Sequence, residues 1–389
     1  MPRTKLLVAG GAALVLAALV YGLVRLPRIV AADMNRVTGA AAPEVSREAA
    51  RLHARILVAD LHADALLWRR DLLERDPVGH VDVPRLIDGN VALQVFSVVT
   101  KTPRGINHER NTAGTDNVTL LAVANRWPLR TWGSLEARAL YQAEKLRRFA
   151  ADSEGRLTVI RSRDELSDYL DRRADEPEIT AGVLALEGTH ALEGDLGAVD
   201  RLFDAGFRIV GLTHFFDNAV GGSAHGVEKG GLTDFGRRVL GRLEERRMIV
   251  DLAHASPALF DDVLATASRP PIVSHAGVQA TCPGPRNLTD DQLRRLADAG
   301  GIVGIGLWDG AVCEATVEAA AAALVHAISV VGPEHVALGS DFDGATTTPI
   351  DAAGLPRVTE ALLGMGLSDR QVAMVMGGNV MRFLGTWLP

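Results

Sequence analysis

The chain has few of the residues that build a disulfide-rich or cysteine-metal protein. Only two of its 389 residues are cysteines, Cys282 and Cys313. Two cysteines exclude a disulfide framework and a cysteine-based zinc site, because both need more thiols. The pair could form one disulfide in an oxidising compartment or remain as two thiols in the core, and the sequence leaves both alternatives open.

The chain also lacks an excess of positive charge, since its net charge is −7. The N-terminal segment 1–28 holds Arg3, Lys5, Arg25 and Arg28 and no acid, so the rest of the chain is near −11 (−7 − 4). An acidic body argues against nucleic acid as a partner, since binding to phosphates needs a basic surface. No Gly-x-Gly-x-x-Gly follows an apolar run, so nothing favours a dinucleotide fold.

Charge is absent from the continuous run 6–24, which has basic residues on both sides. This length can span a bilayer and exceeds the apolar core of a cleaved signal peptide. We therefore expect residues 1–28 to be an N-terminal transmembrane anchor that holds the body outside the cytoplasm, on the periplasmic or extracellular side. A cleaved signal is the alternative, because Ala31 and Ala32 offer small residues nearby, and it would give a secreted protein.

Apolar runs recur through the rest of the chain, after a tether and first helix at residues 29–54. Amphipathic helical patterns separate most of these runs. Apolar strands that alternate with helices predict a parallel sheet covered on both faces, and eight such units predict a closed (β/α)8 TIM-type barrel over residues 55–389. An open doubly wound sheet is the alternative. The eight expected strands are residues 56–64, 92–99, 180–188, 208–215, 248–256, 271–277, 301–307 and 335–344.

Two regions depart from the simple repeat. Residues 100–178 form a long insertion between the second and third strands, with helices expected at 117–125 and 135–151 and a short strand at 157–161. The C-terminal residues 369–384 indicate a closing helix, interrupted at Gly377-Gly378 because glycine weakens a helix interior. The remaining expected helices are residues 196–205, 234–246, 257–267, 290–299 and 315–331.

Potential metal ligands recur where the apolar runs end. His62 and Asp64 end the first run and point to one side of a strand, because they are two residues apart. In a barrel all strand ends converge on one face, where active sites are built. Each histidine could be an ordinary core residue with a hydrogen-bond partner, but the recurrence favours one shared site. The later candidates are Glu187, His214, His254, His275, Asp341 and Asp343.

Oxygen and nitrogen ligands of this kind suit zinc, with manganese or cobalt as substitutes. Four firm ligands and one shared carboxylate could hold two ions that keep open positions for water and substrate. Coordination lowers the pKa of water to about 7, so a bridging hydroxide would be available near neutral pH.

The candidates stand in seven ordered motifs. These are His62-Ala-Asp64, Leu186-Glu187-Gly188, Leu212-Thr213-His214, Val250-Asp251-Leu252-Ala253-His254, Ser274-His275, Arg286-Asn287 and Gly339-Ser340-Asp341-Phe342-Asp343-Gly344. In this order they resemble the motifs of the membrane (renal-type) dipeptidase family, peptidase family M19, a branch of the amidohydrolase superfamily. The resemblance covers about residues 46 to 385.

The resemblance implies two zinc ions per chain. His62 and Asp64 would bind one ion and His254 and His275 the other, with Glu187 bridging them and so taking part in catalysis. It also implies a homodimer, although no segment of the sequence identifies an interface.

The same resemblance implies three further roles. His214 would contact the scissile carbonyl and its developing oxyanion, Arg286 would bind the carboxylate of the substrate, and Asp341 would handle the proton. Without the resemblance, Arg286 would be a solvated loop arginine. Asp341 and Asp343 could serve a turn, since Asp-Phe-Asp-Gly is good turn chemistry.

We therefore expect a zinc-dependent dipeptidase in which a metal-bridging hydroxide attacks the peptide bond of a dipeptide. The alternatives are another amidohydrolase activity, either N-acyl amino acid deacylation or lactone opening, and a catalytically silent binding barrel. The insertion at 100–178 matches no motif of the family, and Trp308 follows the seventh strand where family members often carry other residues that touch the substrate. Substrate preference therefore stays open.

Overall fold

A computed structural model describes residues 21–22, 25–39 and 44–389. The apolar run 6–24 lies almost wholly outside the described residues. Within the described ranges, no helix has the length and apolar character needed to cross a bilayer. The N-terminal anchor therefore stays a prediction.

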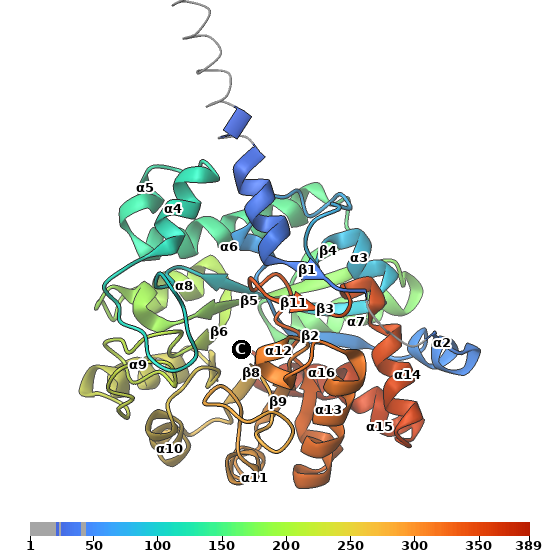
Figure 1. The fold of residues 1–389 in the computed structure, drawn as a ribbon. Coiled ribbons are helices and arrows are strands. Elements are labelled where there is room, and N and C mark those ends of the chain that lie inside the picture. Colours follow the sequence, from blue (N-terminus) through green and yellow to red (C-terminus); the bar gives the residue numbers. More distant parts are fainter. Residues whose placement is uncertain (1–20, 23–24, 40–43) are drawn as a thin grey trace, which may run out of the picture.

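Eight parallel strands close into the predicted barrel (Figure 1). Each strand pairs with the next one along the chain, β10 pairs with β2, and β3 pairs with β5 to complete the ring. Closure rules out the open doubly wound sheet. The strands are β2 (Val58–Ala63), β3 (Val91–Val99), β5 (Thr180–Glu187), β6 (Phe207–Gly211), β7 (Ile249–Asp251), β8 (Ile272–Ala276), β9 (Ile302–Ile305) and β10 (Val336–Leu338).

The expected strand in the insertion is also present, as β4 (Leu157–Val159). It pairs with the first residues of β5, and β6 pairs with the last ones. Because β3 occupies the other edge of β5 from Leu93 to Val99, β4 and β6 must share one edge. The barrel ring is therefore unbroken by the insertion.

The helices follow the alternation that the sequence predicts, and many begin at a capping hydroxyl. Ser134 and Ser162, for example, accept hydrogen bonds from the backbone N–H groups of Ala137 and Glu165. The helices around the barrel and in the insertion are α2 (Arg47–His53), α3 (Val83–Asp88), α4 (Asn117–Ala124), α5 (Arg130–Gly133), α6 (Leu135–Asp152), α7 (Arg163–Asp175), α8 (Ala198–Ala205), α9 (Asp234–Glu245), α10 (Pro257–Thr266), α11 (Asp290–Asp298), α12 (Asp309–Val312), α13 (Val317–Val331), α14 (Pro356–Gly364), α15 (Asp369–Ala373) and α16 (Asn379–Trp387).

The C-terminal helix is interrupted where the sequence predicts. A π-helical turn, Met374–Gly378, separates α15 from α16. A Cβ atom on Gly377 would lie 2.3 Å from the carbonyl oxygen of Leu57, so only glycine allows this approach to the start of β2. The interruption therefore lets the chain turn onto the barrel.

Apolar residues fill the amino end of the barrel. Ile209 and Ile249 are partners in the β6–β7 register, as are Ile272 and Ile302 in the β8–β9 register. They belong to a buried cluster that includes Phe383 of α16. The closing helix thus seals this end with apolar contacts.

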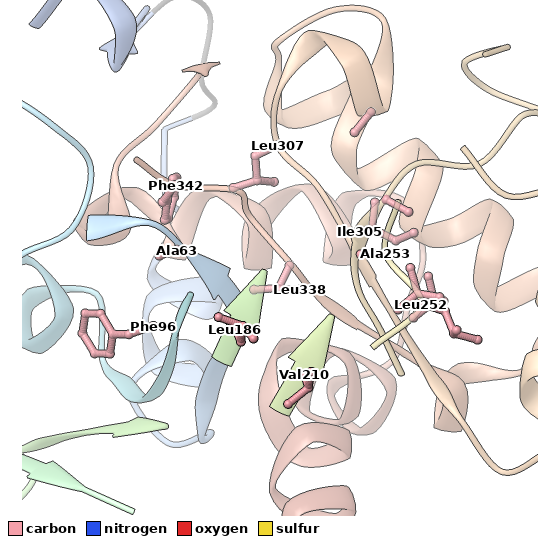
Figure 2. Packing of buried hydrophobic residues seen from close by; sticks show 14 of the residues in the cluster. Ala63, Phe96, Leu186, Val210, Leu252, Ala253, Ile305, Leu307, Leu338 and Phe342 are labelled. Carbon is pink, nitrogen blue, oxygen red and sulfur yellow. The ribbon is translucent and has the colours of Figure 1, made fainter. Parts of the chain in front are cut away.

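A second and larger cluster lies between the strands and the surrounding helices (Figure 2). Leu186 of β5 and Val210 of β6 are register partners in it, and Leu338 of β10 belongs to the same cluster. These side chains alternate with residues of the barrel interior, as expected for strands covered on both faces.

A helix at residues 25–34 stands on the carboxyl end of the barrel, beside α4 and α5 (Figure 1). Ala31 is 5% exposed and packs in a cluster with Trp68 and Val118. After the helix, β1 (Arg36–Val37) pairs in parallel with β11 (Thr347–Thr348). The N-terminal segment is thereby joined to the loop that follows β10.

Candidate metal centre

The seven predicted ligand and catalytic side chains all lie at the carboxyl end of the barrel. Their exposed fractions run from 1% for His62 and His275 to 8% for Asp341. Some stand in strands and others in the loops just beyond them. His62 and His275 lie within β2 and β8, Glu187 ends β5, Asp64 follows β2, and His214, His254 and Asp341 each come three residues after a strand.

Glu187 occupies the middle of the cluster. Its Oε1 atom lies 3.1 Å from Nε2 of His254, 3.4 Å from Nε2 of His275 and 3.8 Å from Nε2 of His62. Its Oε2 atom lies 3.4 Å from Nε2 of His214. One carboxylate thus faces four imidazoles, as a bridging ligand would.

A second group lies beside the first. Nε2 of His62 is 3.5 Å from Oδ2 of Asp64 and 3.8 Å from Oδ1 of Asp341. Three sets of side chains bring one potential ligand atom each to within 4.8 Å of one another. The sets are His62 with Glu187 and His275, Glu187 with His214 and His254, and His62 with Asp64 and Asp341.

Ser274 orients two of the imidazoles, a role that the sequence did not assign to it. Its Oγ lies 2.8 Å from Nδ1 of His275 and 3.3 Å from Nδ1 of His62. Both rings therefore present Nε2 to the centre, in the way that outer hydrogen bonds orient metal-binding histidines. The carboxylate of Asp251 accepts from the N–H of Ser274 at 2.8 Å and so fixes the strand end.

The pKa values of Glu187, Asp341 and His62 are all raised. Burial raises the pKa of Glu187, and the Asp64 carboxylate raises it further. Burial also raises the pKa of Asp341, to about 8. For His62, burial lowers the pKa, but the carboxylates of Asp64, Glu187 and Asp341 outweigh it and raise the pKa to about 10. A cation placed beside these carboxylates would favour their ionised form.

The other three imidazoles are kept neutral. Burial lowers the pKa of His214, His254 and His275 well below its usual value. Neutral imidazole is the form that binds metal ions. Among the described residues, Nε2 of His62 and Oδ1 of Asp64 are buried without a hydrogen-bond partner. Buried nitrogen and oxygen atoms without a hydrogen-bond partner are suitable ligands for divalent metal ions. The residues at this site therefore fit the expected zinc ions.

The backbone at the site takes conformations that side chains seldom adopt. His254 has φ of 63° and Asp341 has φ of 59°, both in the left-handed region. Strained residues of this kind gather at active sites. Gly188 has φ of 95°, and a Cβ atom there would lie 2.4 Å from Cε1 of His190 and 3.3 Å from Cβ of His214. Glycine therefore allows the chain after Glu187 to pass close to both histidines.

Asp343 lies outside the centre, although it is only two residues from Asp341. It is fully buried, pairs with Arg70 and accepts from the N–H groups of His80 and Val81 at 2.8 and 3.1 Å. This carboxylate holds the loop after β2 in place. Asp341, the residue predicted to carry the proton, is the one that faces His62.

Arg286 is a buried arginine with 6% exposure, not a solvated one. Its Nη2 donates to the carbonyl oxygen of His275 at 2.5 Å, and its guanidinium lies 5.5 Å from the centre of the Trp308 ring. It lines one cavity of about 670 Å³ together with most of the candidate residues. The guanidinium can therefore meet an anion beside the centre.

Cys282 and Cys313 form a disulfide, which the sequence left open. Cys282 stands in the loop between β8 and Arg286, and Cys313 follows α12, in the loop that carries Trp308 after β9. The bond thus ties together the two loops on which Arg286 and Trp308 stand.

The family model for membrane dipeptidase (peptidase family M19) matches residues 46–387. A relative named dipeptidase aclJ, from Aspergillus oryzae, is 28% identical over 358 residues, which cover 85% of this chain and 78% of that protein. A Klebsiella pneumoniae protein encoded beside pqqA is 30% identical over 61% of this chain and 92% of its own length.

Solved structures agree with the fold. A metallo peptidase from Rhodobacter sphaeroides, liganded with a phosphinate mimic of the dipeptide L-Ala-D-Ala, is 25% identical with a TM-score of 0.67, over 86% of this chain and 99% of that one. An amidohydrolase from Pseudomonas aeruginosa is 22% identical with a TM-score of 0.68, over 87% and 99%. Since the family model spans most of the sequence, the chain belongs to the membrane dipeptidase family, peptidase family M19.

Proposed function

We propose that the protein is a zinc-dependent dipeptidase with two ions per chain, bridged by Glu187. The observation that carries this proposal is the Glu187 carboxylate among four imidazoles, with the carboxylates of Asp64 and Asp341 beside it. The family membership and the dipeptide mimic bound to the Rhodobacter sphaeroides relative support it. His62 and Asp64 would hold one ion, and His254 and His275 the other.

Zinc ions in such a site supply an activated water near neutral pH and polarise the substrate carbonyl. His214 is neutral because burial lowers its pKa. Its Nε2 edge faces the centre, so as a donor it would stabilise the oxyanion that develops on the carbonyl oxygen. Asp341 faces His62 beside the centre and would accept the proton of the attacking water and pass it to the leaving amine.

Arg286 would bind the C-terminal carboxylate of the dipeptide, because its planar guanidinium matches a carboxylate in a bidentate pair. Replacing Arg286 with alanine should raise KM for a dipeptide much more than for the same dipeptide with an amidated C-terminus. Equal effects on the two substrates would remove this role.

The test of the whole proposal is metal content and dipeptide cleavage by the full-length chain in detergent, before and after chelation and zinc return. About two zinc ions per chain, with activity lost and then restored, is the expected result. A parallel panel of dipeptides, N-acyl amino acids and lactones separates the alternative amidohydrolase activities. Bound zinc with no turnover of any substrate would favour a silent binding barrel.

We also propose that residues 1–28 anchor the protein in a membrane with the barrel outside the cytoplasm. The uncharged run 6–24 supports an anchor, and the disulfide suits an oxidising compartment. The protein should stay in the membrane fraction after an alkaline wash, and protease added outside the cytoplasm should digest the barrel. A homodimer, the assembly that the resemblance implies, is tested by sedimentation in detergent.

A further inference from the structure

The cavity over the candidate metal centre has two unlike parts. Its floor consists of the buried acids and imidazoles of the centre. Its outer wall consists of apolar side chains that no motif includes. The wall is made by Leu26, Val30 and Met34 of the helix at residues 25–34, by Leu120 and Leu121 of α4, and by Trp68 after β2.

The helix that supplies half of this wall is fixed to the barrel at both ends. Near its start, Nη2 of Arg28 lies 3.1 Å from Oδ1 of Asp76. Just after its end, Oδ1 of Asn35 accepts from the N–H of Ala345 at 3.1 Å, in the loop that carries Asp341. Between them Ala31 is buried against Trp68 and Val118. These contacts hold the wall in a defined position over the candidate metal centre.

The strands that lead to α4 and to Arg286 lie on different sides of the barrel. Arg286 stands in the loop after β8, whereas α4 belongs to the insertion after β3. The ring order places β3 four strands away from β8 in either direction, which is directly opposite in a barrel of eight. A substrate whose carboxylate meets Arg286 would extend across the metal centre toward the apolar wall.

We propose that the apolar wall is a subsite for the acyl half of the scissile amide, so that the preferred substrates carry a large apolar group there and a carboxylate on the amine half. This inference rests on the proposed function and names its substrate class. At about 670 Å³ the cavity falls in the range of roughly 300–1,000 Å³ that encloses a drug-sized ligand. Two sources share this chemistry, a dipeptide with a large apolar first residue and an N-acyl amino acid.

The experiment uses the full-length, zinc-loaded chain in detergent. Hydrolysis of Leu-Ala and Phe-Ala is compared with that of Gly-Ala, and Ala-Leu with Ala-Gly as the reversed series. Calorimetry compares the binding of N-octanoyl-alanine with that of N-acetyl-alanine, which gives a readout that does not need turnover. The N-octanoyl compound is also tested as a substrate, and this arm separates the two sources.

Two variants make part of the apolar wall polar, and a third variant is the matched control. Val30→Asn with Met34→Asn changes the helix, and Leu120→Asn changes α4, where Leu120 is 56% exposed and its substitution spares the core. Ile29→Asn lies on the same helix, is 60% exposed and does not line the cavity. All three should fold like the parent.

The expected result is that kcat/KM for Leu-Ala exceeds that for Gly-Ala by about ten-fold or more, since pocket contacts with a few methylenes give at least this discrimination. Both wall variants should lose most of this preference and of the preference for the octanoyl group, and Ile29→Asn should keep both. Equal binding of the octanoyl and acetyl compounds by the parent would overturn the subsite, as would wall variants that keep the preference.

The two proposals fail differently. Dipeptide cleavage without an apolar preference would leave the dipeptidase and remove the subsite. Octanoyl-selective binding that the wall variants lose, without cleavage of any dipeptide, would keep the subsite and remove the dipeptidase.

Discussion

The two ends of the barrel are built from the same eight strands but on opposite principles. The amino end is filled with isoleucines and sealed by Phe383 of α16. The carboxyl end buries acids and imidazoles that have too few partners among the described residues. Burial of apolar groups stabilises a fold, whereas burial of incompletely paired polar groups destabilises it. The amino end therefore stabilises the fold, whereas the carboxyl end lowers its stability and holds a site that a bound cation would complete.

The largest effect is expected from a substitution at the carboxyl end of the barrel. Glu187→Gln keeps the shape of the side chain but removes the central charge. Loss of a metal site costs several kcal/mol of transition-state stabilisation, so we expect kcat/KM for dipeptides to fall more than about a thousand-fold. Zinc content, measured by elemental analysis, should fall with it.

The matched control is Asp343→Asn, a change at another fully buried carboxylate two residues from Asp341. This variant should lose stability, because Asp343 pairs with Arg70, yet it should retain zinc. If Glu187→Gln kept both zinc and activity, the centre would lie elsewhere.

A substitution at the amino end should lower stability without changing the centre. Phe383 is 1% exposed, and Phe383→Ala should lower the free energy of unfolding by about 3–5 kcal/mol through lost burial and the remaining cavity. Denaturant titration measures this loss. Zinc content and kcat/KM at low temperature should stay at parent values. Leu129→Ala, at a residue 74% exposed, should shift stability by less than about 0.5 kcal/mol.

The disulfide lies at the carboxyl end of the barrel but should contribute to stability. The double change Cys282→Ser and Cys313→Ser opens a link across a separation of 31 residues. We expect a loss of about 3 kcal/mol in the free energy of unfolding. KM for dipeptides should also rise, because the bond joins the loops of Arg286 and Trp308. Unchanged thermal unfolding would show that the loops hold their positions without it.

The smallest effect concerns pH. In the metal-free protein the raised pKa of Asp341, about 8, and of His62, about 10, mean that the folded state keeps protons that the unfolded state releases. Their contribution to stability is present at low pH and is lost as pH rises through those values. Between pH 7 and 9 this amounts to at most about 1.4 kcal/mol per pH unit for each proton.

Metal binding removes the same protons, so the gap in melting temperature between zinc-loaded and chelated protein should widen from pH 7 to pH 9. Phe383→Ala should leave this widening unchanged, since its cluster contains no member of the centre. A gap that narrows over this range would contradict the protonation assigned to the metal-free site.

Most of the barrel and its candidate ligands could be predicted from sequence, because both follow from local pattern. Apolar runs that alternate with helices predict the strands, and polar residues at the run ends predict where they meet. Several strands end earlier than the apolar runs predict. His254 and Asp341 have positive φ, which lies outside the β region, so β7 and β10 stop before them.

Features that depend on contacts between distant segments could not be predicted. The sequence pattern does not predict helix α7, because few of its residues are apolar: Leu166 and Tyr169 are buried, and Leu170 is partly buried. The pairing of Cys282 with Cys313 depends on how two loops are positioned. The wall formed by residues 25–34 depends on their packing against α4, which lies much later in the chain. The roles of the candidate residues in binding and catalysis remain predictions.

The position of the helix at residues 25–34 has a practical consequence for enzymology. A protein trimmed to begin after this helix, as is common for chains with an apolar start, would keep every candidate ligand, Arg286 and the closed barrel. It would also lose Leu26, Val30 and Met34 from the cavity. Rates measured on such a protein would report the chemistry of an intact centre. The substrate selectivity measured with it would be that of an incomplete cavity wall.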